Sequence, residues 1–160
     1  KALKNDRIND TDGKTLGGFV RAPLDMASVY GGFYFYAPHL VEVVSEIYGR
    51  YPVSVEAKKS GDIVNVKFNY DGYTVDGMFV DGNYVYYASR HSEEGVTGES
   101  FPIDGNSKCF YIEFDEFYEL LQGGNQKVSY EDFIAPVFVL NAIKRAINSG
   151  EQELVKDYKI

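Results

Sequence analysis

The residue best suited to chemistry in this sequence is His39, which lies in the stretch GGFYFYAPHLVEVVSEIYG at residues 31–49. Pro38 is suited to the first position of a helix, which would place His39 second, where free backbone amides and the helix dipole disfavour the imidazolium. A neutral imidazole can accept a proton from a hydroxyl group, as a general acid/base does. A lone histidine at a helix start is nevertheless more often a packing or capping residue, and both roles remain open.

Aromatic residues occupy the positions just before His39, from Phe33 to Tyr36. Such a run commonly belongs to a hydrophobic core. It also suits the wall of a substrate pocket, in which Tyr34, Phe35 and Tyr36 would contact the ligand beside the histidine. The residue types alone leave both interpretations open.

The other reactive residues form no recognisable site. His91 lies in the polar segment SRHSEEGVTGES, which we expect to be a solvated loop. The single cysteine, Cys109, lies in the apolar run CFYIEF, where we expect a buried thiol without reactivity. The two histidines and this cysteine have no metal-ligand spacing, and the glycine pairs match no phosphate-binding motif. We therefore expect no metal in this chain and no cofactor-binding residues.

The elements that must position these residues follow from hydrophobic periodicity. In IVNVKFNY, at 63–70, apolar and polar residues alternate, so one face of that strand is buried under helices and the other is wet or covered by a partner. The predicted strands are 15–23, a meander of four antiparallel strands within 51–91, and 108–114. The sequence thus predicts an α+β fold: an open, mainly antiparallel sheet with helices packed on one face and the outer face available for oligomerisation.

Three helices are predicted from start and stop signals. The first begins at Ala37 and ends at Gly49, and a short one follows Asp115. Ser129 and Asp132 resemble a capping box for the last helix, which stops at Gly150. Pro136, inside that pattern, should kink the helix or mark its true start.

Composition limits the class of protein. The chain has 160 residues, 44% of them hydrophobic, enough for one domain with a sizeable core. A net charge of −8 disfavours nucleic acid and anionic lipid as partners. The sequence has neither a membrane-spanning run nor a signal peptide, so we expect a cytoplasmic protein. Residues 1–13 are polar and read as the remnant of a linker from a preceding domain, with 14–160 as a single domain.

The order of several segments resembles a known family. A glycine pair, about four apolar residues, a histidine, the helix HLVEVVSEIYG and a strand beginning PVSVEA are similar to the C-terminal domain of the Gfo/Idh/MocA oxidoreductases, the sugar and inositol dehydrogenases. The segment VSYEDFIAPVFVLNAIKRAINSGEQELV looks like that family's closing helix and tail. With the meander between them, the resemblance covers residues 15–155.

The resemblance implies a two-domain enzyme. A Rossmann domain, absent from this chain, would bind NAD or NADP, and residues 14–160 would be the C-terminal domain that binds a sugar or polyol-like substrate and forms a homo-oligomer through its sheet. No cofactor is expected on this chain itself, which should be inactive alone.

The resemblance also assigns roles to individual residues. His39 matches the histidine that serves as general acid/base towards the reacting hydroxyl. The family commonly has an aspartate four residues earlier, where this chain has Phe35. Tyr34, Tyr36 and Glu42 are nearby polar candidates for its work. The missing carboxylate leaves an alternative open: a non-catalytic module of the same fold that binds a small ligand or acts as a scaffold.

Overall fold

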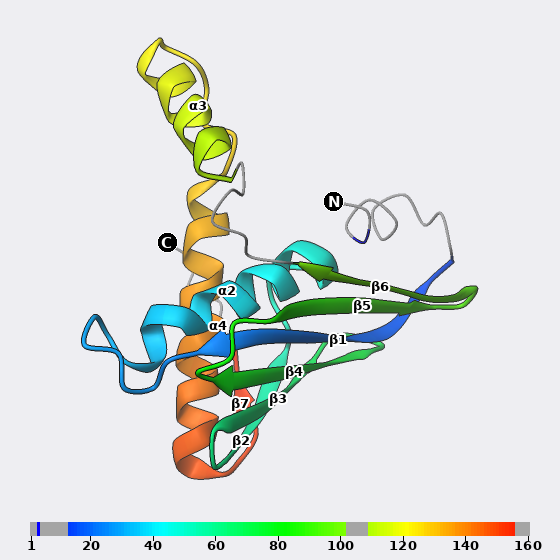
Figure 1. The fold of residues 1–160 in the computed structure, drawn as a ribbon. Coiled ribbons are helices and arrows are strands. Elements are labelled where there is room, and N and C mark those ends of the chain that lie inside the picture. The colour runs from blue at the N-terminus through cyan, green and yellow to red at the C-terminus, as the bar shows by residue number, and fades with distance from the viewer. Residues whose placement is uncertain (1–2, 4–12, 102–108, 156–160) are drawn as a thin grey trace.

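The computed structural model describes residue 3, residues 13–101 and residues 109–155. Figure 1 shows a sheet with two helices against one face and a third helix that extends away from the body. The elements, in chain order, are β1 (Thr15–Leu24), α2 (Phe33–Tyr48), β2 (Ser54–Ser60), β3 (Ile63–Asn69), β4 (Thr74–Asp81), β5 (Tyr86–Ser92), β6 (Gly95–Phe101), α3 (Cys109–Leu121), α4 (Tyr130–Ser149) and β7 (Glu153–Leu154).

The seven strands form one sheet in the order β6-β5-β1-β4-β3-β2-β7. All pairs are antiparallel except β1 with β4, which run parallel. The predicted fold class, α+β with an open and mainly antiparallel sheet, is confirmed. The predicted meander is correct from β2 to β4 but wrong at β5, because β1 is inserted between β4 and β5. Turn signals mark where strands end, but the insertion of an earlier strand leaves no local trace.

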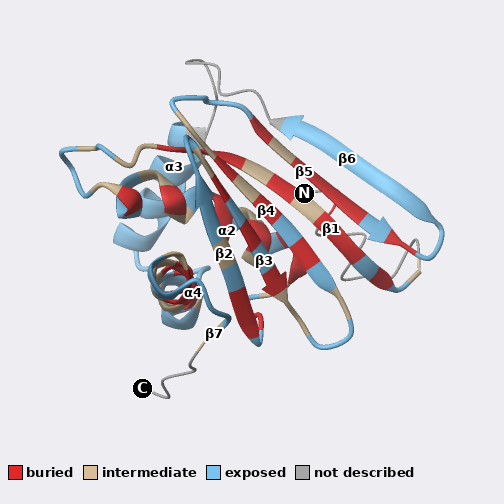
Figure 2. Ribbon diagram, turned by 90° about the horizontal axis from the view of Figure 1, so that it is seen from below, coloured by how far each residue is buried: buried red, intermediate tan, exposed pale blue. Residues whose placement is uncertain are grey.

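One face of the sheet is buried and the other is exposed, as the alternation in β3 predicts. Val64, Val66 and Phe68 are buried, whereas Asn65 and Lys67 are exposed. Figure 2 shows α2 and α4 on the buried side. The core therefore lies between these two helices and the sheet, and the outer face carries polar side chains on β3 and a packed pair of rings, Phe19 and Tyr87, on β1 and β5.

Helix α2 begins earlier than the sequence predicts, at Phe33 rather than Ala37. Gly32 precedes it with φ of 56°, a left-handed conformation that glycine adopts without strain. Phe33 is buried and packs edge-on against Phe79, with ring centroids 6.0 Å apart. Burial of this ring favours an extra turn, so Pro38 lies inside the helix, although Gly49 ends it as predicted.

The segments around residue 100 also differ from the sequence-based prediction. Residues 89–100, expected to form a loop, belong to the β5–β6 hairpin, and His91 is an exposed residue of β5. Residues 109–121 form the helix α3, where a strand over 108–114 and a short helix were expected. The side chain of Cys109 lies outside the described part, so its burial stays a prediction.

Helix α4 confirms the predicted capping box. The Ser129 hydroxyl accepts from the Asp132 amide at 3.2 Å, and the Asp132 carboxylate accepts from the Ser129 amide at 2.9 Å. Gly150 adopts a left-handed conformation just after the last helical residue, as expected. Pro136 lies within the helix and does not mark its start, because the capping box fixes the start six residues earlier.

Candidate active site

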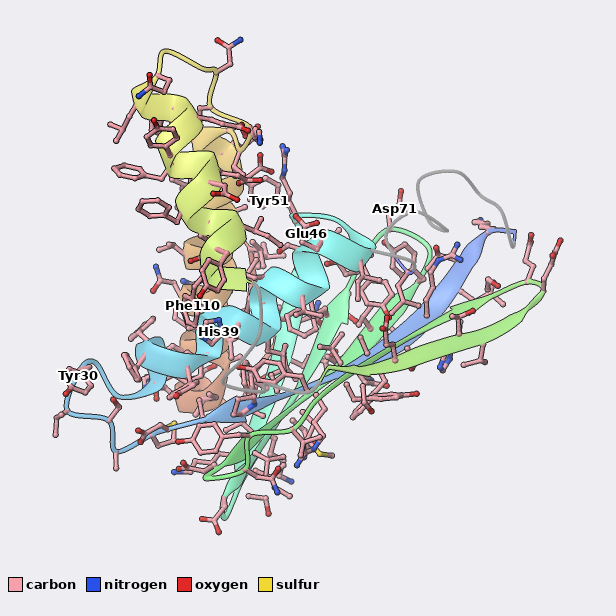
Figure 3. All side chains as sticks on the ribbon, turned by 45° about the horizontal axis from the view of Figure 1, so that its top comes forward. Tyr30, His39, Glu46, Tyr51, Asp71 and Phe110 are labelled. Carbon is pink, nitrogen blue, oxygen red and sulfur yellow. The ribbon has the colours of Figure 1, made fainter. Side chains whose placement is uncertain are left out.

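Helix α2 presents two faces of different character. Its buried face packs on β1 and β4 through residues that include Leu40, Val41 and Val44. Its exposed face carries Phe35, His39, Glu42 and Glu46, which recur at spacings of four, three and four. Figure 3 shows His39 and Glu46 along α2 and Tyr30 in the loop before it. His39 is therefore displayed on a firmly packed helix.

Two tyrosines hold the C-terminal end of this helix. The Tyr73 hydroxyl donates to the backbone oxygen of Tyr48 at 2.6 Å, and the Tyr70 hydroxyl donates to that of Gly49 at 2.8 Å. The two rings stack with centroids 4.9 Å apart. These bonds satisfy carbonyl groups that have no partner within the helix. The orientation of α2, and with it the position of His39, is thus fixed from the sheet.

His39 lies between two tyrosine rings and a carboxylate. Its ring centroid is 5.8 Å from that of Tyr36 and 6.3 Å from that of Tyr86, both edge-on. Its Nδ1 lies 3.5 Å from Oε2 of Glu42, and half of the His39 side chain remains exposed. A carboxylate at Nδ1 favours the tautomer whose Nε2 is free to accept a proton. The contacts therefore leave the second ring nitrogen available for substrate.

The position of His39 corrects the argument made from its sequence context. It lies in the interior of α2, not at the second helical position. The field of a helix terminus falls off within the first turn, so it does not control this imidazole. Glu42 and the neighbouring aromatic rings form its immediate surroundings instead.

A chain of aromatic contacts extends from His39 to the exterior. Tyr36 contacts Tyr84 at 5.5 Å and Phe35 at 5.0 Å, and Phe35 contacts Tyr30 at 5.2 Å, between ring centroids. Tyr30, Phe35 and Tyr84 are exposed. Exposed aromatic rings suit contacts with the apolar faces of a ring-shaped ligand while their edges remain wet. Phe35 and Tyr36 therefore lie beside His39, and their role as the wall of a substrate pocket stays a prediction.

Tyr34 points elsewhere. Its hydroxyl donates to Oδ1 of Asn141 on α4 at 3.1 Å, and its ring packs against Phe33. One turn of a helix separates residues 36 and 39, whereas residue 34 projects from another side. The structure thus brings together three of the four predicted site residues and assigns Tyr34 a contact with α4.

The phenols near His39 favour their neutral form. Burial raises the pKa of Tyr86 to about 12, and the charges of Tyr36 and Glu42 act in the same direction. The pKa of Tyr84 is also raised, first by the neighbouring Tyr36. Both hydroxyl groups are therefore hydrogen-bond donors at neutral pH. With His39, they form a set of groups able to bind and deprotonate a hydroxyl-bearing ligand.

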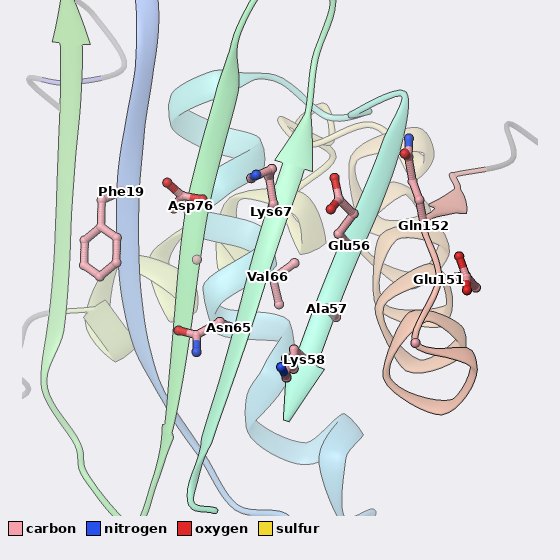
Figure 4. A pocket seen from close by; sticks show the side chains of 12 residues that line it. Phe19, Glu56, Ala57, Lys58, Asn65, Val66, Lys67, Asp76, Glu151 and Gln152 are labelled. Atoms are coloured by element: carbon pink, nitrogen blue, oxygen red, sulfur yellow. The ribbon is translucent and has the colours of Figure 1, made fainter. Parts of the chain in front are cut away.

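A separate hollow of about 700 Å³ lies on the outer face of the sheet, away from His39 (Figure 4). Lys67 on β3 lies between Glu56 on β2 and Asp76 on β4 in the strand register. Gln152, from the connection to β7, borders the hollow at the sheet edge. Its charges alternate in sign across neighbouring strands, which suits a polar contact surface. It has no histidine and is not the candidate catalytic site.

Neither a cluster of metal-ligating side chains nor a strand-to-helix glycine turn at Gly17–Gly18 or Gly31–Gly32 occurs among the described residues. Within 13–101 and 109–155, no group of three or more His, Cys, Asp or Glu side chains is arranged to hold a metal ion. Gly17 and Gly18 lie inside β1, and the Gly31–Gly32 pair follows a loop and is not a strand-to-helix phosphate turn. Among the helices that the structure describes, none is both long and apolar enough to cross a membrane.

Sequence reasoning missed part of this site. Tyr86 and Tyr84 come from a strand and a loop far from His39 in the chain. The run YVYY was their only signal, because aromatic residues on both faces of a strand indicate that something covers each face. Glu42 was one of several polar candidates, and the spacing of three residues from His39 on a helix favours it.

The comparisons with known proteins give structural matches only. No protein-family model matches the chain, and no curated protein matches it in sequence. The fold is similar to that of myo-inositol 2-dehydrogenase from Lactobacillus plantarum, with a TM-score of 0.77, 12% identity and coverage of 97% of this chain and 61% of that chain. The fold is also similar to that of a myo-inositol dehydrogenase from Corynebacterium glutamicum, with a TM-score of 0.74 and 11% identity. That match covers 98% of this chain and 61% of the other.

A third match was solved with a dinucleotide. An oxidoreductase from Agrobacterium radiobacter, in complex with NAD+, L-tartaric acid and magnesium, has a TM-score of 0.64 and 11% identity, and the match covers 96% of this chain and 60% of that one. The chain thus spans about three fifths of the length of these proteins. Its fold is that of part of the inositol dehydrogenases and related oxidoreductases, which confirms the resemblance predicted from the sequence.

Proposed function

We propose that this chain is the C-terminal domain of an NAD(P)-dependent sugar or polyol dehydrogenase. The observation that carries the proposal is the fold match, which includes nearly all of this chain but only about three fifths of each dehydrogenase. An exposed histidine on a packed helix supports it. In this proposal the domain supplies the substrate wall and the oligomer contact, and a preceding Rossmann domain binds NAD or NADP.

The proposed role of His39 is proton transfer. Oxidation of a secondary alcohol removes a hydride from carbon and a proton from oxygen. The dinucleotide, held by the other domain, provides the hydride acceptor. His39 takes the proton at Nε2 while its Nδ1 faces the Glu42 carboxylate, which stabilises the resulting imidazolium. Phe35 and Tyr36 form the proposed wall for the carbon skeleton of the substrate.

The test is turnover of the full-length protein with NAD+ or NADP+ and a panel of cyclic polyols and sugars. We expect His39→Asn to lower kcat by about a hundredfold or more, because a general acid/base typically contributes 10²–10⁴-fold. The matched control is His91→Asn, which removes the other histidine, an exposed residue of β5 on the opposite side of the sheet. Unchanged turnover after His39→Asn would leave His39 a structural residue.

One observation favours a second candidate function. Phe35 occupies the position at which the family commonly has an aspartate, and it contacts Tyr30 and Tyr36 rather than a polar group. A domain of this fold that binds a small ligand without chemistry, or serves as a scaffold, would keep the aromatic wall and need no carboxylate there. Ligand binding by the full-length protein without any reduction of NAD+ or NADP+ would support this alternative.

A further inference from the structure

Helix α3 displays a stripe of large apolar side chains. Phe110, Phe114, Phe117 and Leu121 are 75%, 65%, 56% and 64% exposed. Their spacings of four, three and four place them on one face of the helix. Acidic side chains such as Asp115, Glu116 and Glu119 lie around the other faces. The helix therefore has the amphipathic pattern of an element that packs against a partner.

No partner for this stripe lies in the described part of the chain. Every side chain described from Phe110 to Tyr130 is exposed. A helix of this length is marginal in water unless one face is buried against other structure. The apolar side chains continue onto the first turns of α4, where Tyr130, Phe133 and Val137 are exposed too. We call α3 and residues 130–137 of α4 the arm.

The arm is fixed to the body at its base. Arg50, just after α2, lies 3.4 Å from Oε2 of Glu131 and forms a second ion pair with Asp132. Further along α4, Val139, Leu140 and Ile143 are buried in the core. Figure 1 shows the arm on the same side of the sheet as α2, pointing away from the body. Its apolar stripe is thus held at a defined place beside the helix that carries His39.

We propose that the arm is the docking face for the dinucleotide-binding domain of the full-length protein. The proposal rests on the proposed function. About two fifths of each matched dehydrogenase lies outside the part that this chain covers. In a full-length protein of that kind, the remaining domain must contact this domain. Catalysis at His39 requires the dinucleotide on the α2 side of the sheet. The arm offers that domain an apolar surface on that side.

A second copy of this chain fits the arm poorly. Residues 113–119 carry four carboxylates, at Glu113, Asp115, Glu116 and Glu119, and Lys127 is the nearby cation, paired with Glu119 at 2.8 Å. Two arms facing each other would bring like charges together around their apolar stripes, which costs free energy. The charge favours an occupant with basic residues around its apolar contact. A different domain can meet that condition, whereas an identical arm cannot.

The experiment is hydrogen exchange on the full-length protein, compared among variants. We expect the amides of residues 109–121 to exchange at least tenfold more slowly in the parent protein than in the Phe114→Asp variant. The reason is that the added charge disrupts the apolar contact and frees the helix. Ile112→Asp is the matched control, since it adds the same charge on another face of α3. Protection of α2 and β1 should stay unchanged in both variants, which shows that the domain itself still folds.

The outcomes separate docking from function. Equal exchange of α3 in the parent protein and in the Phe114→Asp variant would overturn the docking proposal, even if the protein binds NAD+ and oxidises polyols. Protection that increases with protein concentration would identify a second copy as the occupant and would also overturn it. Docking would be supported by protection of α3 that does not depend on protein concentration and is lost in the Phe114→Asp variant, together with chemical cross-links between α3 and the preceding domain. This holds even in a protein without dehydrogenase activity.

Discussion

At the scale of single residues, we expect Glu42 to do the work of the aspartate that the family commonly has four residues before the histidine. The usual carboxylate lies one helical turn before the histidine, and here a carboxylate lies one turn after it, 3.5 Å from Nδ1. We expect Glu42→Gln to lower kcat by about tenfold with little change in KM, because the residue orients the imidazole without touching substrate. The measurement is the steady-state kcat and KM of the full-length protein, determined separately.

Glu46→Gln is the control for this prediction, since it removes a carboxylate one turn farther along the same exposed face of α2. The Glu46 substitution should leave both kcat and KM unchanged. Equal kcat values for the parent protein and the Glu42→Gln variant would exclude a positioning role for Glu42.

The buried hydroxyl group of Tyr48 makes the stability of the protein depend on alkaline pH. Its hydroxyl donates to the backbone oxygen of Ser89 inside the core, and Gly18 has no Cβ to obstruct it. Burial raises the pKa of Tyr48 well above its ordinary value of about 10. The unfolded chain therefore loses this proton first. The contribution of Tyr48 to the free energy of unfolding is constant below about pH 10 and falls as pH rises further.

We expect Tyr48→Phe to cost about 1 kcal/mol at neutral pH, through loss of the buried hydrogen bond. The variant should also lose less stability than the parent between about pH 9 and pH 11. Urea unfolding across this range measures both effects. Tyr111→Phe, at an exposed position of α3, should change neither. A parent and variant with the same slope against pH would show that Tyr48 does not control alkaline stability.

At the scale of elements, the capping box gives α4 its own dependence on acid. Hydrogen bonds from Ser129, followed by the charge of Arg50, hold the pKa of Asp132 below its usual value. The stabilisation is present above about pH 4, where the unfolded carboxyl is ionised, and is lost as pH falls through the lower folded pKa. We expect Ser129→Ala to cost about 1 kcal/mol at pH 7 and less at pH 3.

Urea unfolding of the two proteins at both pH values tests this prediction. Ser149→Ala is the control, because that serine also bonds locally but at the other end of α4, where its hydroxyl contacts Glu153. A cost for Ser129→Ala that is the same at both pH values would show that the carboxylate of Asp132 takes no part in the cap.

Local signals explain which elements could be predicted from the sequence. The capping box, the terminal glycines and the alternation in β3 act between near neighbours, so their residue types suffice. Residues 108–114 read as a strand because short aromatic and apolar runs fit both periodicities. The spacing of Phe110, Phe114 and Phe117 indicates a helix only when the window extends past the expected strand end. Burial of Phe33, a tertiary effect, moved the start of α2.

The candidate site could be predicted from the sequence only for the residues that lie close together in the chain. His39, Phe35 and Tyr36 belong to one helix, so their grouping follows from sequence spacing. Tyr86 and Tyr84 join them only because β5 pairs with β1 on its far side from β4. That strand order depends on long-range packing, and no nearby residues encode it. Confirmation of the fold by comparison leaves the role of each of these residues a prediction.

At the scale of the whole molecule, the outer face of the sheet is the surface that we expect to form a homo-oligomer. The neighbours Glu56, Lys67 and Asp76 alternate in charge there. We expect Lys67→Glu to weaken self-association at least tenfold, because it places three carboxylates side by side at the contact. Sedimentation of the full-length protein over a hundredfold range of concentration measures this effect.

Lys59→Glu is the matched control for the oligomer, because Lys59 on β2 pairs with the buried Val64 and so projects to the other face of the sheet. It makes the same change of charge and should leave the assembly intact. A full-length protein that sediments as a monomer at every concentration would contradict the prediction at once.

The central place of β1 has a consequence for how the protein is made. Residues 15–24 leave the ribosome before the other strands of this sheet, yet their neighbours are residues 74–81 and 86–92. At a synthesis rate of about 5–20 residues per second, roughly 3–14 s pass between the synthesis of this apolar strand and that of the second of its two partner strands. The nascent chain therefore emerges with its middle strand uncovered, and chaperone binding to Val20, Ala22 and Leu24 would protect it until β5 arrives.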